Sequence, residues 1–219
     1  MAPACRRRYR RSVGREHRVI DPDYRYHVVS KGNNGGLIVR DRIDYDSFCH
    51  DLDRIATRYL WEVWAWVLMP NHFHLVAQTP PGALSAGMQQ LNGNNGRRMN
   101  RRHGREGHLV KNRFFSLALE SDQHEVASVA YVARNPVKAG LCRNAADWHF
   151  SSHRATMGLE PAPRWLAVST VLERFGDSLE DARKLLWHRV HSGHLPVSDT
   201  IEVVARWEPP FVRDPRIAA

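Results

Sequence analysis

The stretch that most constrains how this chain can fold is residues 61–78, WEVWAWVLMPNHFHLVAQ, whose pattern predicts a β-hairpin. Two apolar runs flank residues 69–71 (MPN), and Pro and Asn at such a connection favour a tight turn. The first run is rich in Trp and Val, which fit a pleated and largely buried strand. Side chains alternate in direction along the second run, so His72 and His74 share one face and Phe73 takes the other. We therefore expect the core of the fold to form around this hairpin.

The two histidines of the hairpin are candidate metal ligands. Two imidazoles that lie two residues apart on a strand converge from one surface, which suits a divalent metal ion. The same spacing is also typical of two half-exposed histidines that bind nothing, so this alternative stays open. His27, on a strand expected at residues 24–29, could approach the pair if the two strands are neighbours. Its alternative interpretation is an ordinary surface or core histidine.

A second chemically distinctive stretch is residues 131–141, YVARNPVKAGL. Upstream of it, Asp122 can cap a helix that carries an apolar stripe at helical spacing. Tyr131 and Asn135 are four residues apart, so they lie on one face of this helix and their side chains can meet. Pro136 has no backbone N–H and is expected to end or kink the helix there. Taken alone, the helix is most simply a Tyr packed under a sheet with an Asn at the break.

The order of predicted elements indicates an α+β fold, in which an antiparallel sheet has helices packed on it. We expect a short strand at residues 37–39, an amphipathic helix at 44–60 and a further strand at 117–119. The Gly- and Asn-rich run at 92–96 is expected to interrupt the helix that follows the hairpin.

The chain divides into three parts on its composition. Residues 1–20 have no periodic apolar face and are interpreted as a basic flexible arm, and residues 21–158 form the main domain. Residues 159–219 are expected to form a helical accessory region and an irregular tail. The helices of this region are predicted at 165–175 and 178–190, because apolar residues recur there at helical spacing and Ser178 begins a capping pattern.

Positive charge is concentrated in two stretches. Residues 1–20 carry seven Arg and one Glu, and residues 97–113 carry seven Lys or Arg and one Glu, while the net charge of the whole chain is +9. Concentrated arginine beside a candidate metal site points to phosphate, and so to nucleic acid. The alternative is a solvated basic tail or loop. The candidate DNA-binding residues in the second stretch are Arg97, Arg98, Arg101, Arg102, Arg105, Lys111 and Arg113.

Composition excludes several other classes of protein. A hydrophobic content of 42% with seven Trp argues for a folded globule rather than a disordered chain. No apolar run approaches the length of a membrane span, and the N-terminus lacks the apolar middle of a signal peptide, so we expect a cytoplasmic protein without a membrane partner. The three cysteines are widely spaced and form no CxxC pattern, so neither a disulfide framework nor a thiolate zinc site is indicated.

The two distinctive stretches together resemble a known family. MPNHFHLV, followed about fifty residues later by YVARNPVKAGL, is similar to the single-tyrosine HUH (His, hydrophobic, His) transposases, and most of all to the REP-associated tyrosine transposases. The segments YHVVSKGNN, NRRHGREGHLVKNRFFS and WHFSSHRA also resemble that family, so the likeness spans roughly residues 24–155. Five blocks in the right order make this resemblance specific.

The resemblance implies a ferredoxin-like sheet and a chemistry for each site residue. Tyr131 would be the nucleophile, and His72 and His74 would hold Mg²⁺ or Mn²⁺ with Asn135 as third ligand, at a position where relatives carry Gln. Such an enzyme cleaves and rejoins single-stranded DNA that contains a hairpin, through a covalent 5′-phosphotyrosine. Both a monomer and a homodimer are compatible with this chemistry.

Two other classes of function compete with the enzyme. A DNA-hairpin-binding protein without catalysis would keep the basic stretches but would not need His72, His74, Tyr131 and Asn135 together. A phosphoesterase acting on RNA ends is the other alternative, and such enzymes usually carry a second motif of the form HxT or HxS. The presence of a coherent set of four residues favours the enzyme.

Overall fold

The computed structural model describes residues 21–192, 199–206 and 209. The predicted arm at 1–20 and the end of the tail, from 210, lie outside the described residues. The strands are β1 (Arg25–Lys31), β2 (Glu62–Leu68), β3 (His72–Gln78) and β4 (Phe115–Leu119). The helices are α1 (Arg42–Arg58), α2 (Ala83–His103), α3 (Asp122–Lys138), α4 (His153–Thr156), α5 (Val168–Glu173), α6 (Leu179–Ser192) and α7 (Asp199–Ala205), with 3₁₀ turns η1 (Asn33–Gly35) and η2 (Ala145–Asp147).

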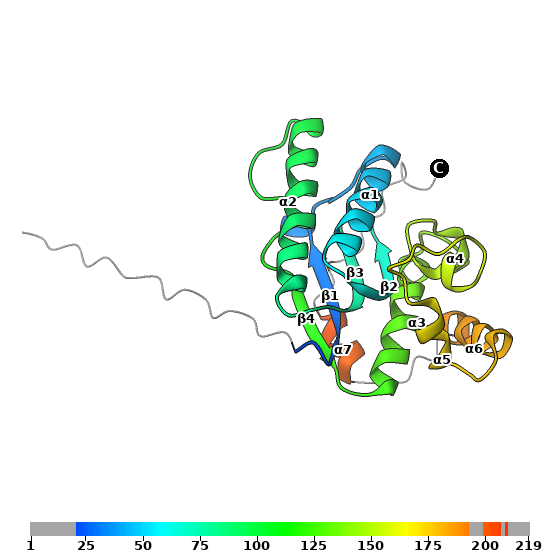
Figure 1. The fold of residues 1–219 in the computed structure, drawn as a ribbon. Coiled ribbons are helices and arrows are strands. Elements are labelled where there is room, and N and C mark those ends of the chain that lie inside the picture. Colours follow the sequence, from blue (N-terminus) through cyan, green and yellow to red (C-terminus); the bar gives the residue numbers. More distant parts are fainter. Residues whose placement is uncertain (1–20, 193–198, 207–208, 210–219) are drawn as a thin grey trace, which may run out of the picture.

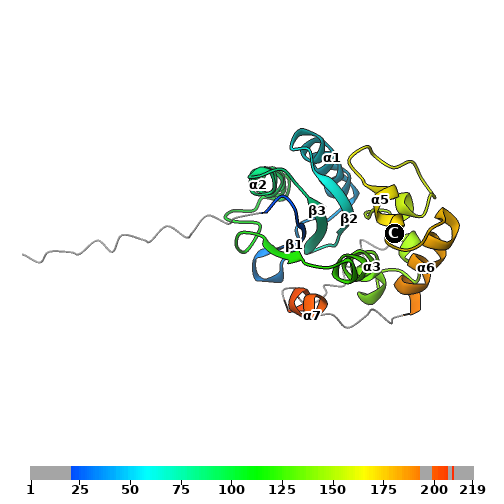
Figure 2. The same cartoon turned by 60° about the horizontal axis from the view of Figure 1, so that its bottom comes forward.

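These strands form one antiparallel sheet in the order β2-β3-β1-β4 (Figure 1). The chain order β1-α1-β2-β3-α2-β4 is that of a ferredoxin-like fold, so the predicted α+β class is confirmed. Helices α1 and α2 cover one face of the sheet, and α3 and α7 cover the other (Figure 2). Within the described residues, no helix is long and apolar enough to cross a membrane.

The predicted hairpin lies in the middle of this arrangement. Strand β3 is buried along nearly its whole length because helices cover both of its faces. On the α1 face, Phe73 packs edge-to-face on Phe48, with ring centroids 5.0 Å apart. Just before the start of β2, helix α2 approaches closely through Gly87, where a Cβ atom would lie 2.3 Å from the Trp61 ring. The histidine-bearing face of β3 is left for α3.

The strand predicted at 37–39 does not form. This segment instead lies against the hairpin turn, where the backbone N–H groups of Ile38 and Val39 both donate to the Pro70 carbonyl at 2.8 and 3.3 Å. Ile38 and Val39 are fully buried. The apolar character of the segment therefore reflects packing under a turn rather than a place in the sheet.

The Gly-Asn run does not interrupt α2, which is continuous from Ala83 to His103. Its asparagines bind neighbouring segments instead of breaking the helix. Asn95 donates from Nδ2 to the Ile38 carbonyl at 2.9 Å, and Asn92 accepts from Ser30 Oγ at 3.1 Å. These tertiary hydrogen bonds outweigh the low helix propensity of the run.

Helix α3 has a different N-cap from the one predicted, and of the two outcomes expected at Pro136, an end or a kink, the end does not occur. Ser121, not Asp122, is the N-cap, and its side chain accepts a hydrogen bond from the backbone N–H of His124 at 3.3 Å. The helix also passes through Pro136 and ends one residue beyond Val137, at Lys138. Its last turn is closed by the bond from Ala139 N–H to the Asn135 carbonyl, at 3.0 Å.

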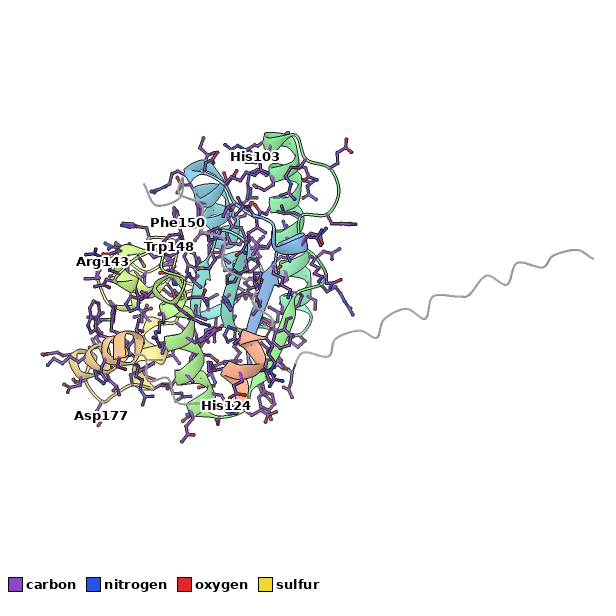
Figure 3. The ribbon with its side chains drawn as sticks, turned by 180° about the vertical axis from the view of Figure 1, so that it is seen from behind. His103, His124, Arg143, Trp148, Phe150 and Asp177 are labelled. Atoms are coloured by element: carbon purple, nitrogen blue, oxygen red, sulfur yellow. The ribbon has the colours of Figure 1, made fainter. Side chains whose placement is uncertain are left out.

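The segment after α3 closes the core against β2 and α1. Trp148 donates from Nε1 to the Leu68 carbonyl at 3.1 Å, and Phe150 stacks on Tyr45 of α1 with ring centroids 4.2 Å apart. Trp148 and Phe150 lie together on this side of the molecule (Figure 3). Further along the chain, the backbone N–H and carbonyl of Val63 form hydrogen bonds with the residues just before and just after Leu166. The outer edge of β2 is therefore covered at this point.

The predicted C-terminal helices are present as α5 and α6. Ser178 caps α6 through its hydroxyl, which accepts from the Asp181 backbone N–H at 3.1 Å and donates to the Asp181 carboxylate at 2.8 Å. The pair packs against α3 and β2. Helix α7 was not predicted, and it lies against α3 and β4 on the opposite side of α3 from α6 (Figure 2).

Candidate active site

His72 and His74 lie fully buried on the face of β3 that α3 covers. Their ring centroids are 5.0 Å apart and their rings are nearly perpendicular. Register places Val29 of β1 opposite His74 and Lys31 opposite His72, so side chains from β1 share this face. The alternation of a strand thus puts both histidines where the helix with the candidate nucleophile packs.

Tyr131 and Asn135 reach the same place from α3. Asn135 is fully buried, and its amide nitrogen lies 3.4 Å from His74 Nε2. The Tyr131 ring is edge-on to the His74 ring, with centroids 5.9 Å apart. The structure therefore brings together all four residues that the sequence singled out, from two segments about sixty residues apart.

Each histidine has its Nδ1 atom in a hydrogen bond. His72 Nδ1 lies 2.8 Å from Asn71 Oδ1, and His74 Nδ1 lies 3.0 Å from His27 Nε2. A carboxamide oxygen only accepts, so His72 carries its proton on Nδ1 and has a lone pair on Nε2. If His74 donates from Nδ1 to His27 Nε2, His74 has the same tautomer as His72. Such partners orient metal-binding histidines, and His74 Nε2 lies on the side of Asn135 of α3.

The donor set at this position fits a divalent metal ion. Two imidazole Nε2 atoms and one amide oxygen could serve as ligands, the oxygen after a 180° rotation of the Asn135 amide that turns Oδ1 toward His74. His27 is fully buried beside the pair, and its Nε2 lies 3.0 Å from His74 Nδ1. The pairing of β1 with β3 brings His27 to the histidine pair, where it contacts His74 as a ring partner.

The Tyr131 phenol has two further contacts. Lys138 Nζ lies 3.4 Å from its hydroxyl and 5.0 Å from the centre of its ring. On the other side the ring packs with Val29 of β1 and Val204 of α7, and Tyr131 is 3% exposed. The phenol is therefore nearly inaccessible to a substrate in this conformation.

The candidate DNA-binding residues fall into two groups. Arg98 forms a 2.6 Å ion pair with Asp51 of α1, and Arg102 pairs with Asp41 and Asp44 at the start of α1. Arg105 donates to the Leu37 carbonyl at 3.1 Å. These three bind other parts of the protein, whereas the exposed ones are Arg97, Arg101, Lys111 and Arg113.

Two of the exposed cations lie beside the β1 residues that pair with the histidines. Lys111 and Arg113 line a shallow depression together with Lys31, which is opposite His72 in the sheet register. The backbone N–H of Lys111 donates to the Lys31 carbonyl at 3.1 Å, which fixes this loop to β1. Burial, and next the charge of Lys111, lower the pKa of Lys31. A phosphate at this depression would relieve the repulsion between the two lysines.

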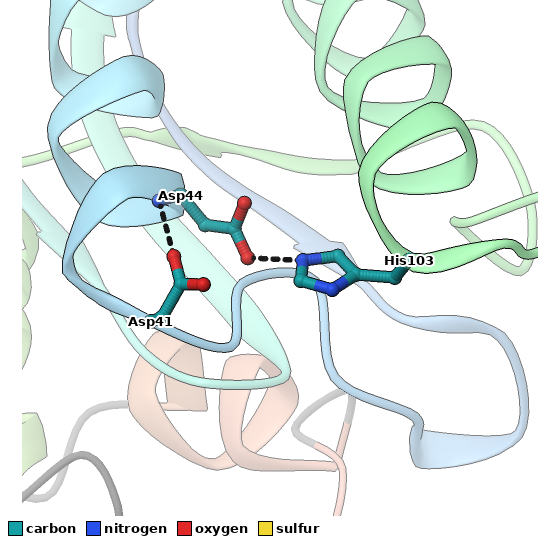
Figure 4. A group of neighbouring side chains, drawn as sticks. All are labelled: Asp41, Asp44 and His103. Atoms are coloured by element: carbon teal, nitrogen blue, oxygen red, sulfur yellow. Dashed lines mark hydrogen bonds and ion pairs between the residues drawn. The ribbon is translucent and has the colours of Figure 1, made fainter.

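A separate cluster of Asp41, Asp44 and His103 joins α1 to the end of α2 (Figure 4). Asp41 caps α1 by accepting from the Asp44 backbone N–H at 3.0 Å, and Asp44 lies 2.8 Å from His103 Nε2. Arg102 binds both carboxylates, and its hydrogen bond to Asp41 is the main reason that the pKa of Asp41 is lowered. With a guanidinium already in place, the cluster is an ion-pair network between two helices.

The chain does contain an HxS sequence, at His149-Phe150-Ser151. Its histidine is exposed, and Ser151 Oγ donates to the Trp148 carbonyl at 3.1 Å. The Ser151 hydroxyl is thus bonded within its own segment, and His149 points to solvent rather than toward the fully buried His72 and His74. The geometry therefore gives no support to an RNA-end phosphoesterase.

Two comparisons with known proteins found matches. The family model described as "Transposase IS200 like" matches residues 17–135, more than half of the chain. A solved structure, described as that of the REP-associated tyrosine transposase bound to a REP hairpin, has the same fold with a TM-score of 0.53 and 23% sequence identity. That match covers 67% of this chain and 87% of the other. A search of curated proteins gave no match.

Proposed function

Because the chain belongs to the IS200-like transposase family, we propose that it cleaves and rejoins single-stranded DNA through a covalent bond to Tyr131. The observation that carries this proposal is the meeting of His72, His74, Tyr131 and Asn135 on one face of the sheet. A buried histidine pair beside a tyrosine is a costly arrangement unless it serves a site, because imidazole and phenol groups lose hydration there.

The nucleotide substrate that we propose is a single strand folded into a hairpin. The structural relative described above is bound to a REP hairpin, and the two folds coincide over most of that protein. In this chain the exposed cations Lys111 and Arg113 share a depression with Lys31, which is opposite His72 in the sheet, and they could hold backbone phosphates near the cleaved bond. Arg97 and Arg101, on the exposed side of α2, would follow the strand further.

The chemistry assigns one task to each residue. Tyr131 supplies the oxygen that attacks phosphorus, leaving a 5′-phosphotyrosine and a free 3′-hydroxyl. His72, His74 and Asn135 would hold Mg²⁺ or Mn²⁺, which when bound neutralises a phosphate oxygen and fixes its position. Asn71 accepts from His72 Nδ1 and so leaves His72 Nε2 for the ion, and His27 would do the same for His74 by accepting from its Nδ1. The phosphotyrosine is a phosphate diester, close in free energy to the DNA phosphodiester that it replaces. The 3′-hydroxyl of the same or another strand can therefore reverse the step.

One observation favours a second candidate, a hairpin-binding protein without catalysis. Tyr131 is covered by Val29 and by Val204 of α7, so its phenol is out of reach in this conformation. The exposed basic residues do not depend on α7 and could bind DNA in either case. The two candidates differ in whether the phenol becomes accessible when DNA is bound.

The experiment that separates them uses a labelled single-stranded oligonucleotide with a hairpin, with Mg²⁺ or Mn²⁺. Wild-type protein is expected to give a covalent protein–DNA band on a denaturing gel, and Tyr131→Phe is expected to give none. Tyr59→Phe is the matched control, because Tyr59 is the C-cap of α1 and is not part of the site. Binding without a covalent band in the wild type, over a range of hairpins, would leave only the binding protein.

A further inference from the structure

Lys138 has no task in the function proposed above, yet it touches the candidate nucleophile. It is the last residue of α3, and its Nζ atom donates to the Tyr131 hydroxyl at 3.4 Å. The ammonium group also lies 5.0 Å from the centre of the ring. Unlike Tyr131 and Asn135, Lys138 is exposed, so its side chain reaches from solvent toward the buried phenol.

The continuation of α3 through Pro136 produces this contact. Tyr131, Asn135 and Lys138 are at positions i, i+4 and i+7, which fall on one face of an uninterrupted helix. A helix that ended before Pro136 would have released Lys138 into a loop. The last turn of α3 therefore places a cation, a carboxamide and a phenol in a row along the side of the helix that faces β3.

We propose that Lys138 is a further catalytic residue that binds a non-bridging oxygen of the phosphate attacked by Tyr131. This inference rests on the function proposed above. Once the phenol oxygen bonds to phosphorus, the non-bridging oxygens are two bonds from that oxygen. They then come within hydrogen-bond distance of an ammonium group that already contacts the phenol oxygen. Lysine commonly serves as a point charge for phosphate in this way.

The step balances with Lys138 protonated throughout. The phenol gives its proton to water, a bond forms between Tyr131 Oη and phosphorus, and the bond from phosphorus to the 3′ oxygen breaks. The electron pair of that bond leaves on the 3′ oxygen, which takes a proton from water. The ammonium of Lys138 holds a phosphoryl oxygen while charge is redistributed, which is the general way that such clamps lower a barrier.

The first test compares rates of covalent adduct formation in single turnovers. Lys138→Met removes the charge and keeps the length of the chain, Lys138→Arg keeps a charge, and Lys184→Met is the control. Lys184 is an exposed lysine of α6 whose ion pair, with Glu180, is unrelated to the site. Lys138→Met is expected to slow the adduct by about 10²-fold, the size found when one donor to a developing charge is removed. Lys138→Arg should recover part of this loss, and Lys184→Met should match the wild type.

The second test separates contact with phosphate from a merely structural role. One non-bridging oxygen of the cleaved phosphate is replaced by sulfur, as each of the two diastereomers. In the wild type, the diastereomer with sulfur at the lysine-facing position should react more slowly, and this difference should shrink in Lys138→Met. Slowing at the metal-facing position should persist in the variant. A structural role would slow both diastereomers and the all-oxygen substrate alike, with the two sulfur effects unchanged.

Three results would overturn the inference. An adduct rate for Lys138→Met within twofold of the wild type, or sulfur effects that are the same in both proteins, would remove Lys138 from the chemistry and leave the phosphotyrosine function intact. Absence of any adduct in the wild type would overturn the proposed function, and this inference with it.

Discussion

At the scale of single residues, the hydrogen bonds to Nδ1 decide what the histidine pair can do. Asn71 accepts from His72 at 2.8 Å, and His27 lies 3.0 Å from His74 Nδ1. A histidine whose Nδ1 is bound in this way presents Nε2 to a ligand with a fixed ring orientation. The partners of the pair therefore help to set the orientation of both rings.

Replacement of His27 by Phe is expected to weaken metal binding without unfolding the protein. Phe fills a similar volume at a fully buried position but cannot bond to His74, so the His74 ring loses its fixed tautomer. Loss of such a partner usually lowers metal affinity by about 10–100-fold. Calorimetric titration with Mn²⁺ would measure the change, with His50→Phe, an exposed position on α1, as control. Equal affinities in all three proteins would contradict the assignment of His27.

The site residues differ in how far sequence alone could predict them. His72 and His74 share a face because strands alternate, and Tyr131 and Asn135 share one because helices repeat every 3.6 residues, so both pairs are visible in the sequence. Whether His27 lies in the site depends on which strand pairs with β3. That pairing joins segments far apart in the sequence, so local patterns do not predict it. Lys138 was missed because Pro136 was expected to end the helix that carries it.

At the scale of elements, arginines of α2 hold that helix to α1. Arg98 and Asp51 form a 2.6 Å ion pair in which the side chains are 16% and 10% exposed, and Arg102 joins Asp41 and Asp44. The basic run therefore divides once the chain is folded. Some of its members bind other parts of the protein, and the others face solvent. Sequence alone could not predict which arginines are paired and which are exposed, because this depends on which side of α2 faces α1.

Replacement of Arg98 by Met is expected to lower the free energy of unfolding by about 3 kcal/mol, since it leaves the Asp51 carboxylate buried without its main partner. Arg97→Met, at the neighbouring exposed position, is the matched control and is expected to change stability by less than about 0.5 kcal/mol. Urea unfolding followed by circular dichroism measures both. Equal stabilities of the two variants would contradict the division of the basic residues into two groups.

The contact between α4 and α6 contains a buried histidine that should make stability depend on pH. Burial, and next the nearby His191, lower the pKa of His153 from 6.5 to about 4. As pH falls below 6.5, the unfolded chain takes up a proton that the folded protein does not, so stability falls until pH reaches about 4. The total loss from this group is about 3 kcal/mol.

His153→Phe is expected to flatten this pH dependence, because the replaced side chain has no proton to bind. Urea unfolding at pH 7, 5 and 4 measures it, with His149→Phe, an exposed position nearby, as control. The decline in stability between pH 7 and 4 should be smaller in His153→Phe than in the control. Parallel declines would contradict the assignment.

The elements themselves were largely predictable, and the errors have clear causes. The hairpin, α1, α3 and α6 carry strong periodic patterns, and all four are present. The segment at 37–39 is apolar because it packs under the hairpin turn, which local pattern does not distinguish from a strand. The Gly-Asn run is helical because its asparagines form hydrogen bonds with β1 and with the segment that follows β1.

At the scale of the whole molecule, the exposed positive charges define the path that we propose for a bound DNA strand. The four exposed members of the second basic stretch lie on α2 and on the loop that leads into β4, and two of them share a depression with Lys31, which pairs with His72 in the sheet. Removal of one phosphate contact is expected to lower the slope of log affinity against log salt by about 0.7 for a single strand. Arg113→Met should show this reduction in a salt titration of oligonucleotide binding. Arg164→Met is the control, because Arg164 lines a separate groove near α5. Equal slopes for Arg113→Met and Arg164→Met would contradict the proposed path of the strand.

The central claim is that Tyr131 forms a covalent bond to DNA, and mass spectrometry of the trapped complex tests it most directly. The wild-type protein would be incubated with a hairpin-containing single strand and Mn²⁺, then digested with protease and nuclease. The account predicts a peptide that contains Tyr131 and carries a nucleotide through a 5′-phosphate on the phenol oxygen. A nucleotide on any other residue, or cleaved DNA with no modified peptide, would contradict it.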